Sequence, residues 1–363
     1  MPEPNDKFRI LAVDGGGMRG LIPALVIADL ERRLQAEAGP DTRVADYFHM
    51  FAGTSTGGLV ALSLTVPDHP GGDRPKLSAS KLAELYTSDG EKIFHRSFWQ
   101  KLRTLWGFIA PKYTLGPLED AVKRNLGADA KLADALRDLV VVAYDMTDRE
   151  PYFFKRWPAR ENETRNYGLS HAALATSAAP TYFPSHEVDQ HALVDGGVFA
   201  ANPTLAAAVE ALKRRHDEPS HLSTDDLLAV SIGTGLHETH YTQAEVSRWG
   251  TLGWVLPKDG EPPILATVLG GATDGVDHWT HTLLNEPPPP HVTKEEIGRG
   301  PRFYRLQVEL DPPIPMDKPE ELPALEAAAQ QLISDREEEL SEIAARLLRA
   351  GPIAPDPFQP STP

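Results

Sequence analysis

Cysteine does not occur among the 363 residues of the chain. Disulfide bonds and metal sites built from thiolates are therefore excluded. Long hydrophobic runs are missing too, since the chain has no stretch of about 18 apolar residues, the length that a membrane-spanning helix needs. The first seven residues carry neither the basic region nor the apolar core of a signal peptide. Together these absences predict a cytoplasmic protein.

Basic residues are in short supply, with 36 Lys and Arg against 52 Asp and Glu, for a formal net charge of −16. Such a chain repels phosphate groups, which argues against non-specific binding to nucleic acid. The segment Glu91–Tyr113 reverses the balance locally, because it interleaves Lys and Arg with aromatic residues and its only acid is Glu91. It is a candidate for peripheral membrane contact, but the same aromatics could instead pack as a cap over an active site.

Short apolar segments of β-forming residues alternate with segments of helical periodicity. The expected strands are Phe8–Val13, Tyr47–Ala52, Leu139–Tyr144, Leu227–Ile232 and Phe303–Leu310. The expected helices are Ile22–Leu34, Leu59–Val66, Lys81–Gly90, Leu118–Leu126, Thr204–Arg215 and a last, solvated one over Leu322–Arg349. Because alternating strands and helices build parallel sheets, the sequence predicts a three-layer α/β/α sandwich with a mostly parallel central sheet.

Ser55 stands between two glycines, Gly53 and Gly57, where an expected strand runs into an expected helix. This is the context of a nucleophile elbow, a tight turn with small flanking residues that presents the serine hydroxyl at the edge of the sheet. The N–H groups at the start of the helix would face the reacting centre. The alternative interpretation is a plain strand-to-helix turn.

A second glycine-rich turn, Asp14-Gly-Gly-Gly-Met-Arg19-Gly20, follows the first expected strand. Its spacing matches the dinucleotide-binding fingerprint, so an oxidoreductase is one alternative. That fingerprint also needs an acidic residue at the end of the next strand, where this chain has Gly-Thr-Ser-Thr-Gly instead. Consecutive glycines can also turn their N–H groups toward one point, so Gly15, Gly16 and Gly17 are candidates for an oxyanion hole.

A third signal, Asp195-Gly-Gly, follows a short expected strand and offers a carboxylate that could act as a base. Alone, an Asp-Gly pair usually marks a turn. His237, His278 and His281 come later and could complete a triad, but their surroundings do not resemble a catalytic-histidine loop. The His-Glu-x-x-His pattern and other metal-binding spacings are missing from the chain.

In this order the three motifs resemble those of the patatin-like phospholipases, and the plant-type patatins most closely. The stretches Thr176–Pro184, Ser231–Gly235 and Tyr241–Trp254 strengthen the resemblance. It extends from about Phe8 to about Ile333. The expected organisation is an N-terminal extension over 1–7, a patatin-like catalytic domain over 8–333, the end of the C-terminal helix over 334–350, and a disordered, proline-rich tail over 351–363.

The resemblance implies a serine lipid acyl hydrolase, of phospholipase A or esterase type, that cleaves fatty-acyl esters of phospholipids or neutral lipids without a cofactor or a metal. Ser55 would be the nucleophile and Asp195 its base, in a dyad without histidine. Gly15, Gly16 and Gly17 would hold the oxyanion, and Arg19 would add positive charge nearby or brace the loop.

Free aspartate has a pKa of about 4 and is a poor base at neutral pH, so Asp195 would have to be desolvated or hydrogen-bonded mainly by Ser55. Two alternatives keep the same fold. One is a storage or membrane-binding protein, and the other is an effector hydrolase gated by a small signalling molecule.

Overall fold

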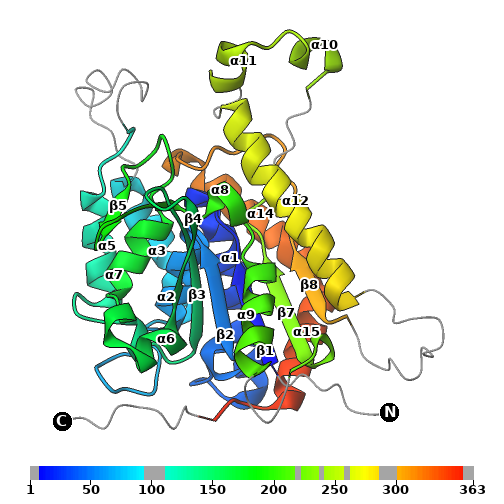
Figure 1. The fold of residues 1–363 in the computed structure, drawn as a ribbon. Coiled ribbons are helices and arrows are strands. Elements are labelled where there is room, and N and C mark those ends of the chain that lie inside the picture. Colours follow the sequence, from blue (N-terminus) through cyan, green and yellow to red (C-terminus); the bar gives the residue numbers. More distant parts are fainter. Residues whose placement is uncertain are drawn as a thin grey trace.

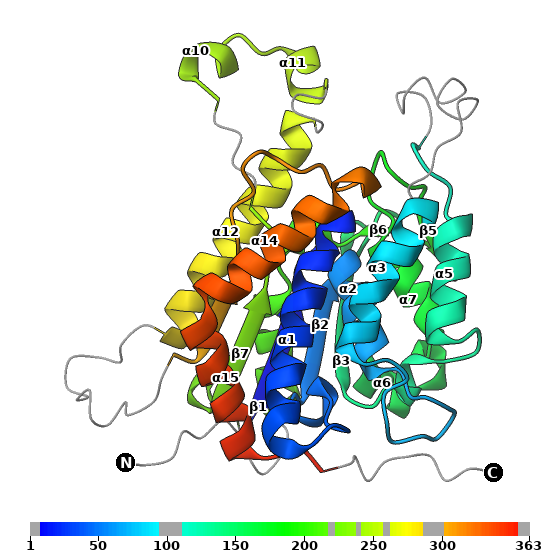
Figure 2. The same ribbon diagram turned by 180° about the vertical axis from the view of Figure 1, so that it is seen from behind.

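The computed structural model describes residues 8–93, 111–216, 222–236, 241–256, 262–285 and 301–354. These residues form a central sheet that helices cover on both faces (Figures 1 and 2). The strands are β1 Phe8–Val13, β2 Met50–Thr54, β3 Asp138–Asp145, β4 Glu150–Lys155, β5 His186–Val188, β6 His191–Asp195, β7 Leu227–Ile232 and β8 Phe303–Leu306. The helices are α1 Leu21–Ala38, α2 Thr56–Thr65, α3 Ala79–Ile93, α5 Gly116–Leu126, α6 Arg156–Glu161, α7 Leu169–Thr176, α8 Gly197–Ala200, α9 Thr204–His216, α10 Gln243–Val246, α11 Thr251–Val255, α12 Pro263–Asn285, α14 Leu322–Asp335 and α15 Glu337–Ala350.

The sheet runs in the order β5-β6-β3-β2-β1-β7-β8, and β4 also pairs with β3. Strands β3, β2, β1, β7 and β8 are parallel to one another, whereas β4, β5 and β6 pair in antiparallel fashion. This arrangement confirms the predicted three-layer α/β/α sandwich with a mostly parallel sheet.

Two hydrophobic cores lie on the two faces of the sheet. Because successive side chains of a strand alternate, Ile10 and Ala12 of β1 enter one core while Leu11 and Val13 enter the other. The helices α8, α9 and α12 lie in front of the sheet in Figure 1, and α1, α2, α14 and α15 cover the opposite face in Figure 2. Burial on both faces explains why most residues of the central strands are apolar.

The predicted strands at Phe8–Val13 and Leu227–Ile232 are confirmed to the residue. The strand predicted from Tyr47 begins only at Met50, because the Tyr47 N–H group donates to the carbonyl of Val44 and closes a turn. Apolar side chains in such a turn also enter the core, so hydrophobicity alone did not separate turn from strand.

The strand predicted at Phe303–Leu310 is shorter than expected and ends at Leu306. Beyond it, the side-chain oxygen of Gln307 accepts a hydrogen bond from the Gly235 N–H group at 2.8 Å. A side chain thus replaces the backbone as partner, and the regular ladder stops.

The C-terminal region is not one solvated helix but two helices, α14 and α15, which meet at Arg336. Both pack on α1, and Leu332, Leu340 and Leu347 are buried in the same core as the strands. The break at Arg336 turns the chain so that both helices can lay an apolar face on the body. Of the expected tail, Ile353 donates its N–H group to the carbonyl of Asp46 at 2.7 Å.

Several sequence predictions fall wholly or mainly outside the described residues. They are the N-terminal extension 1–7, nearly all of the basic aromatic segment Glu91–Tyr113, His237, and the tail from residue 355. Among the helices that the structure does describe, none is both long and hydrophobic enough to cross a bilayer.

Candidate active site

The register of β3 brings Ser55 and Asp195 together. Strand β2 runs parallel to β3 and ends with Thr54 opposite Val142, whereas β6 runs antiparallel and ends with Asp195 opposite Ala143. Since β4 occupies the other edge of β3 over these residues, β2 and β6 share one edge and run toward each other. The residue after β2 and the last residue of β6 therefore meet.

Ser55 forms a sharp turn between β2 and α2. Its φ of 54° lies in the left-handed region, which is strained for a residue with a side chain. The turn is held by the Ser55 N–H group, which donates to Thr176 Oγ1 at 2.8 Å, and the Thr176 hydroxyl donates in turn to the carbonyl of Val142 at 2.5 Å. Strain that the surroundings impose at a polar side chain is typical of functional sites.

Neighbouring backbone atoms lie so close to Gly53 and Gly57 that neither position has room for a side chain. A Cβ atom on Gly57 would collide with the carbonyl oxygen of Val13, and one on Gly53 would collide with the carbonyl oxygen of Gly57. The Gly-x-Ser-x-Gly spacing therefore reflects the packing of α2 against β1 and β2, and it lets α2 begin at Thr56 with its N-terminus toward Ser55.

Asp195 is buried, with 5% of its surface exposed. Burial raises its pKa from 3.8 to about 6, although hydrogen bonds from the Ser55 hydroxyl and the Gly197 N–H group oppose the rise. The Gly197 N–H group lies 2.8 Å from Asp195 Oδ1. The desolvation that sequence reasoning required of this carboxyl group is thus present.

The glycine turn after β1 lies against Ser55, since a Cβ atom on Gly15 would come within 3.3 Å of Ser55 Cβ. The Gly15 N–H group donates to the carbonyl of Ala201 at 3.0 Å, whereas the N–H groups of Gly16 and Gly17 have no hydrogen-bond partner among the described residues. Gly17 has a φ of 57°, and a Cβ atom there would collide with the carbonyl of Met316. The turn thus directs two N–H groups away from the backbone network.

Two further contacts concern this turn. The Thr234 hydroxyl donates to the carbonyl of Gly15 at 2.6 Å and anchors the turn to the end of β7. Arg19 lines the cavity beside Ser55, and its buried Nε atom has no partner within the described part of the chain.

A buried ionic network underlies the glycine turn. Arg305 of β8 contacts both carboxylate oxygens of Asp14, at 3.1 and 2.6 Å, and its Nε atom lies 2.9 Å from Asp277 of α12. Burial raises the pKa of Asp14 to about 6, which the Arg305 charge opposes. Sequence analysis missed Arg305 and Asp277, although a charged residue inside an apolar strand such as β8 is a signal of a buried pair.

Ser55 and Asp195 open onto a cavity of about 250 Å³. Most of its wall is apolar and comes from α3, α5, α12 and the segment after α7, including Leu85, Val122, Phe183 and Leu269. The glycine turn, Ser55 and Asp195 contribute polar groups to the same cavity. Such a cavity suits a ligand that combines one reactive polar group with a long apolar part.

Comparison with known proteins shows the family of this chain. A family model described as patatin-like phospholipase matches residues 11–208. The chain belongs to the patatin-like phospholipase family. It is 35% identical over 293 residues to patatin-like protein 1 of Oryza sativa subsp. indica, a match that covers 76% of this chain and 70% of that protein. It is 36% identical over 296 residues to patatin-like protein 2 of Arabidopsis thaliana, covering 76% and 72%.

Among solved structures, VipD from Legionella pneumophila aligns over 90% of this chain and 67% of its own, with 11% identity and a TM-score of 0.36. That likeness is too weak to carry an argument. Membership of the patatin-like phospholipases supports a lipid acyl hydrolase in general terms, and the residues that would perform the reaction have to be argued from the site itself.

Two of the later histidines, His278 and His281, lie on α12 in this patatin-like chain, and both are exposed to solvent. No histidine of the described residues lines the cavity. The groups that perturb the pKa of Asp195 are likewise Ser55 and Gly197 rather than an imidazole.

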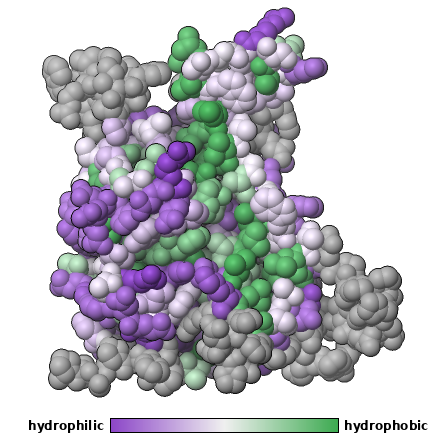
Figure 3. All heavy atoms as spheres, in the orientation of Figure 1, coloured by the Kyte–Doolittle hydropathy of each residue, from purple (hydrophilic) through white to green (hydrophobic). Residues whose placement is uncertain are grey.

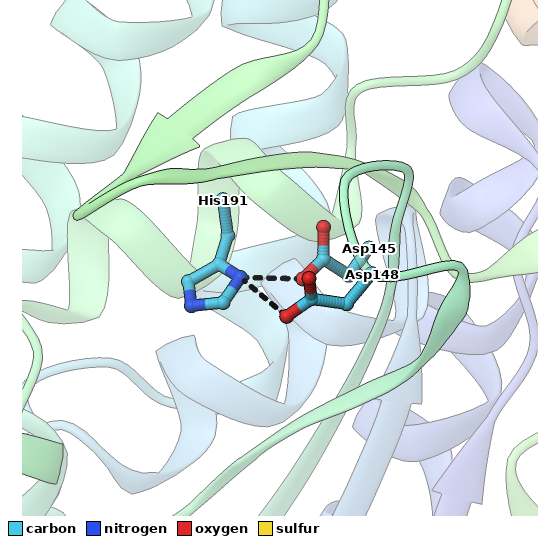
Figure 4. Close-up of side chains that lie close together, drawn as sticks. All are labelled: Asp145, Asp148 and His191. Atoms are coloured by element: carbon cyan, nitrogen blue, oxygen red, sulfur yellow. Dashed lines mark hydrogen bonds and ion pairs between the residues drawn. The ribbon is translucent and has the colours of Figure 1, made fainter.

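A second cluster of titratable groups lies at the start of β6. Figure 4 shows the His191 ring facing the carboxylates of Asp145 and Asp148, with Nδ1 at 2.5 and 3.5 Å from their oxygens. The three could offer ligand atoms within 4.8 Å of one another to a cation. Burial opposes ionisation of Asp145, but N–H groups of Thr147 and Asp148 and the His191 ring lower its pKa. These hydrogen bonds already explain the cluster, which fastens the β3–β4 turn to β6.

Proposed function

We propose that this protein is a serine lipid acyl hydrolase of phospholipase A or esterase type, in which Ser55 is the nucleophile and Asp195 its base. The observation that carries the proposal is the hydrogen bond between the Ser55 hydroxyl and a buried carboxyl group whose pKa is raised to about 6, in the lining of a largely apolar cavity. An aspartate with that pKa is mostly ionised at neutral pH and yet more basic than a free one.

The reaction would proceed in two halves. Ser55 Oγ attacks the ester carbonyl carbon while Asp195 takes the hydroxyl proton, and collapse of the tetrahedral intermediate breaks the ester bond. The alcohol leaves with the proton from Asp195, and the acyl group stays on Ser55. A water molecule then attacks the acyl-enzyme while Asp195 accepts one of its protons. Collapse of the second intermediate breaks the bond to Ser55 Oγ, Asp195 returns the proton to that oxygen, and the fatty acid is released.

The N–H groups of Gly16 and Gly17 are the best candidates for oxyanion donors, because they lack partners among the described residues. The Gly15 N–H group is engaged by Ala201, so Gly15 would instead let the turn approach Ser55 closely. Arg19 at the cavity wall would add positive charge where the oxyanion develops. The apolar wall would hold the acyl chain. A cytoplasmic location and a membrane role for Glu91–Tyr113 stay predictions.

Labelling with a fluorophosphonate tests the proposal directly. The reagent should form one adduct, on Ser55, and Ser55→Ala should abolish both labelling and hydrolysis of a p-nitrophenyl ester, a loss of several orders of magnitude. Ser63 lines the same cavity from α2 and provides the matched control, since Ser63→Ala should label like the wild type. Undiminished labelling of the Ser55→Ala variant would show that another residue is the nucleophile.

A further inference from the structure

Helix α12 has two apolar faces with different surroundings. Leu265 and Leu269 line the cavity and form part of its wall. In the same turns, the neighbouring residues Ile264 and Val268 are exposed large hydrophobic residues. The helix therefore presents apolar side chains both to the cavity and to solvent.

Ahead of α12 in the chain, α10 and α11 project from the body of the molecule beyond the end of α12 (Figures 1 and 2). An aromatic cluster holds this projection together, with ring centroids 4.7 Å apart for Tyr241 and Trp249 and 5.2 Å for Trp249 and Trp254. Its aliphatic side chains face outward, and Leu252 is 71% exposed. Figure 3 shows hydrophobic residues at this projection and along α12.

Charge is nearly absent from both segments, although the chain as a whole carries a formal charge of −16. Residues 246–256 include one charged residue, Arg248, and residues 262–273 include none. Between these two stretches stand Lys258, Asp259 and Glu261, and the next acidic residue after them is Asp274. An exposed surface of Leu, Ile and Val with few charges is typical of elements that enter the interfacial region of a lipid layer.

We propose that this surface docks the protein on a lipid layer and places the cavity against its substrate. The α11–α12 apolar surface consists of Leu252, Val255, Leu256, Ile264 and Val268. A lipid layer is favoured over a protein partner because Ile264 and Val268 directly precede Leu265 and Leu269 of the cavity wall on α12, so that a lipid layer held at this surface would lie beside the cavity. The inference rests on the proposed lipid hydrolase for its purpose, but docking itself does not require the reaction.

Vesicle binding tests the inference separately from catalysis. The full chain carrying Ser55→Ala should sediment with phosphatidylcholine vesicles, and the binding should be insensitive to salt because it is apolar. Adding Leu252→Asp and Val268→Asp should weaken it at least tenfold, since two large side chains no longer leave water. Both positions are exposed, so the fold should be unchanged by circular dichroism.

Trp279→Asp is the matched control. Trp279 is an exposed apolar residue of α12, 58% accessible, but it lies beyond Asp274 and outside the α11–α12 apolar surface. This variant should bind vesicles as tightly as the parent chain. With Ser55 present, the double aspartate variant should keep its turnover of a soluble p-nitrophenyl ester and lose turnover of vesicle lipid.

The outcomes separate the two proposals. Vesicle binding that depends on Leu252 and Val268, together with no ester turnover by the chain that keeps Ser55, would support docking and overturn the hydrolase. Equal binding by the double variant and its parent would overturn docking and leave the hydrolase standing. A dimer in sedimentation velocity that the double variant breaks, without vesicle binding, would assign the surface to a second copy and overturn the lipid assignment.

Discussion

Asp195 has to satisfy two opposed requirements. Burial makes it a stronger base, because its charged form loses hydration, but the same burial makes the ionised site costly for the fold. The hydrogen bonds from Ser55 and Gly197 compensate only in part, since the pKa remains above that of a free aspartate. Loss of the Asp195 proton should therefore raise the proposed activity and lower the stability of the fold.

The pH profile of hydrolysis should reflect this residue. Turnover of a soluble ester should rise with pH and reach half its maximum near pH 6, since Asp195 acts as a base only when ionised. A profile measured from pH 4.5 to 8 would check it. A midpoint near pH 4, the value of a free aspartate, would contradict the assignment.

Stability should change in the opposite direction. The pKa of Asp195 is raised in the folded state, so the folded protein binds the proton more tightly than the unfolded chain does. Proton binding therefore stabilises the fold at low pH, and this stabilisation is lost as the pH rises from 3.8 through about 6. A difference of roughly two pKa units corresponds to about 3 kcal/mol. Asp195→Asn should therefore be inactive but more stable in urea unfolding at pH 8, with a gain that shrinks toward pH 5. A loss of stability at pH 8 would contradict this account.

Among the secondary-structure elements, β1 and β8 are joined across β7 by Asp14 and Arg305. Asp14 directly precedes the glycine turn, and Asp277 of α12 forms a second ion pair with Arg305. Removing one member of a buried pair leaves the other charge unpaired, which costs more than the pair contributes.

Arg305→Met should therefore lower the free energy of unfolding by about 3–5 kcal/mol. Adding Asp14→Asn should recover part of that loss, because the unpaired carboxylate is then gone. Urea unfolding of both variants at pH 7 checks the pair. If the double variant were less stable than Arg305→Met alone, Asp14 would not be the group that Arg305 neutralises.

At the scale of the whole molecule, the C-terminal helices contribute more to the hydrophobic core than their composition indicates. The exposed Glu337-Glu338-Glu339 run favoured a solvated element, but Leu340, Ile343 and Leu347 of α15 are fully buried against the body. The main core therefore includes residues on both sides of 333, the boundary that the resemblance implied.

Leu340→Ala should lower the free energy of unfolding by about 2–5 kcal/mol, the usual loss for a large-to-small change in a core. Glu338→Ala on the exposed side of the same helix should change it by less than about 0.5 kcal/mol. Thermal or urea unfolding of the two variants measures the difference. Equal stability would mean that α15 does not contribute to the cooperative core.

The sequence by itself determined the elements and the candidate residues. Mostly apolar runs located β1 and β7 to the residue, because burial on both faces leaves a strand with few polar positions. Glycine spacing marked the turn at Ser55, because a backbone that packs this closely has no room for a Cβ atom. Both signals come from residues that are close together in the chain, so they can be recognised in the sequence alone.

Only the tertiary structure decided which residues meet. Ser55 and Asp195 are neighbours because β2 and β6 end at adjacent positions on the same edge of β3, and strand order is not encoded in the periodicity of either segment. The same holds for Arg305 beside Asp14 and for α12 as the cavity wall. The raised pKa of Asp195 depends on what surrounds it in space, since desolvation comes from packed neighbours and not from adjacent sequence.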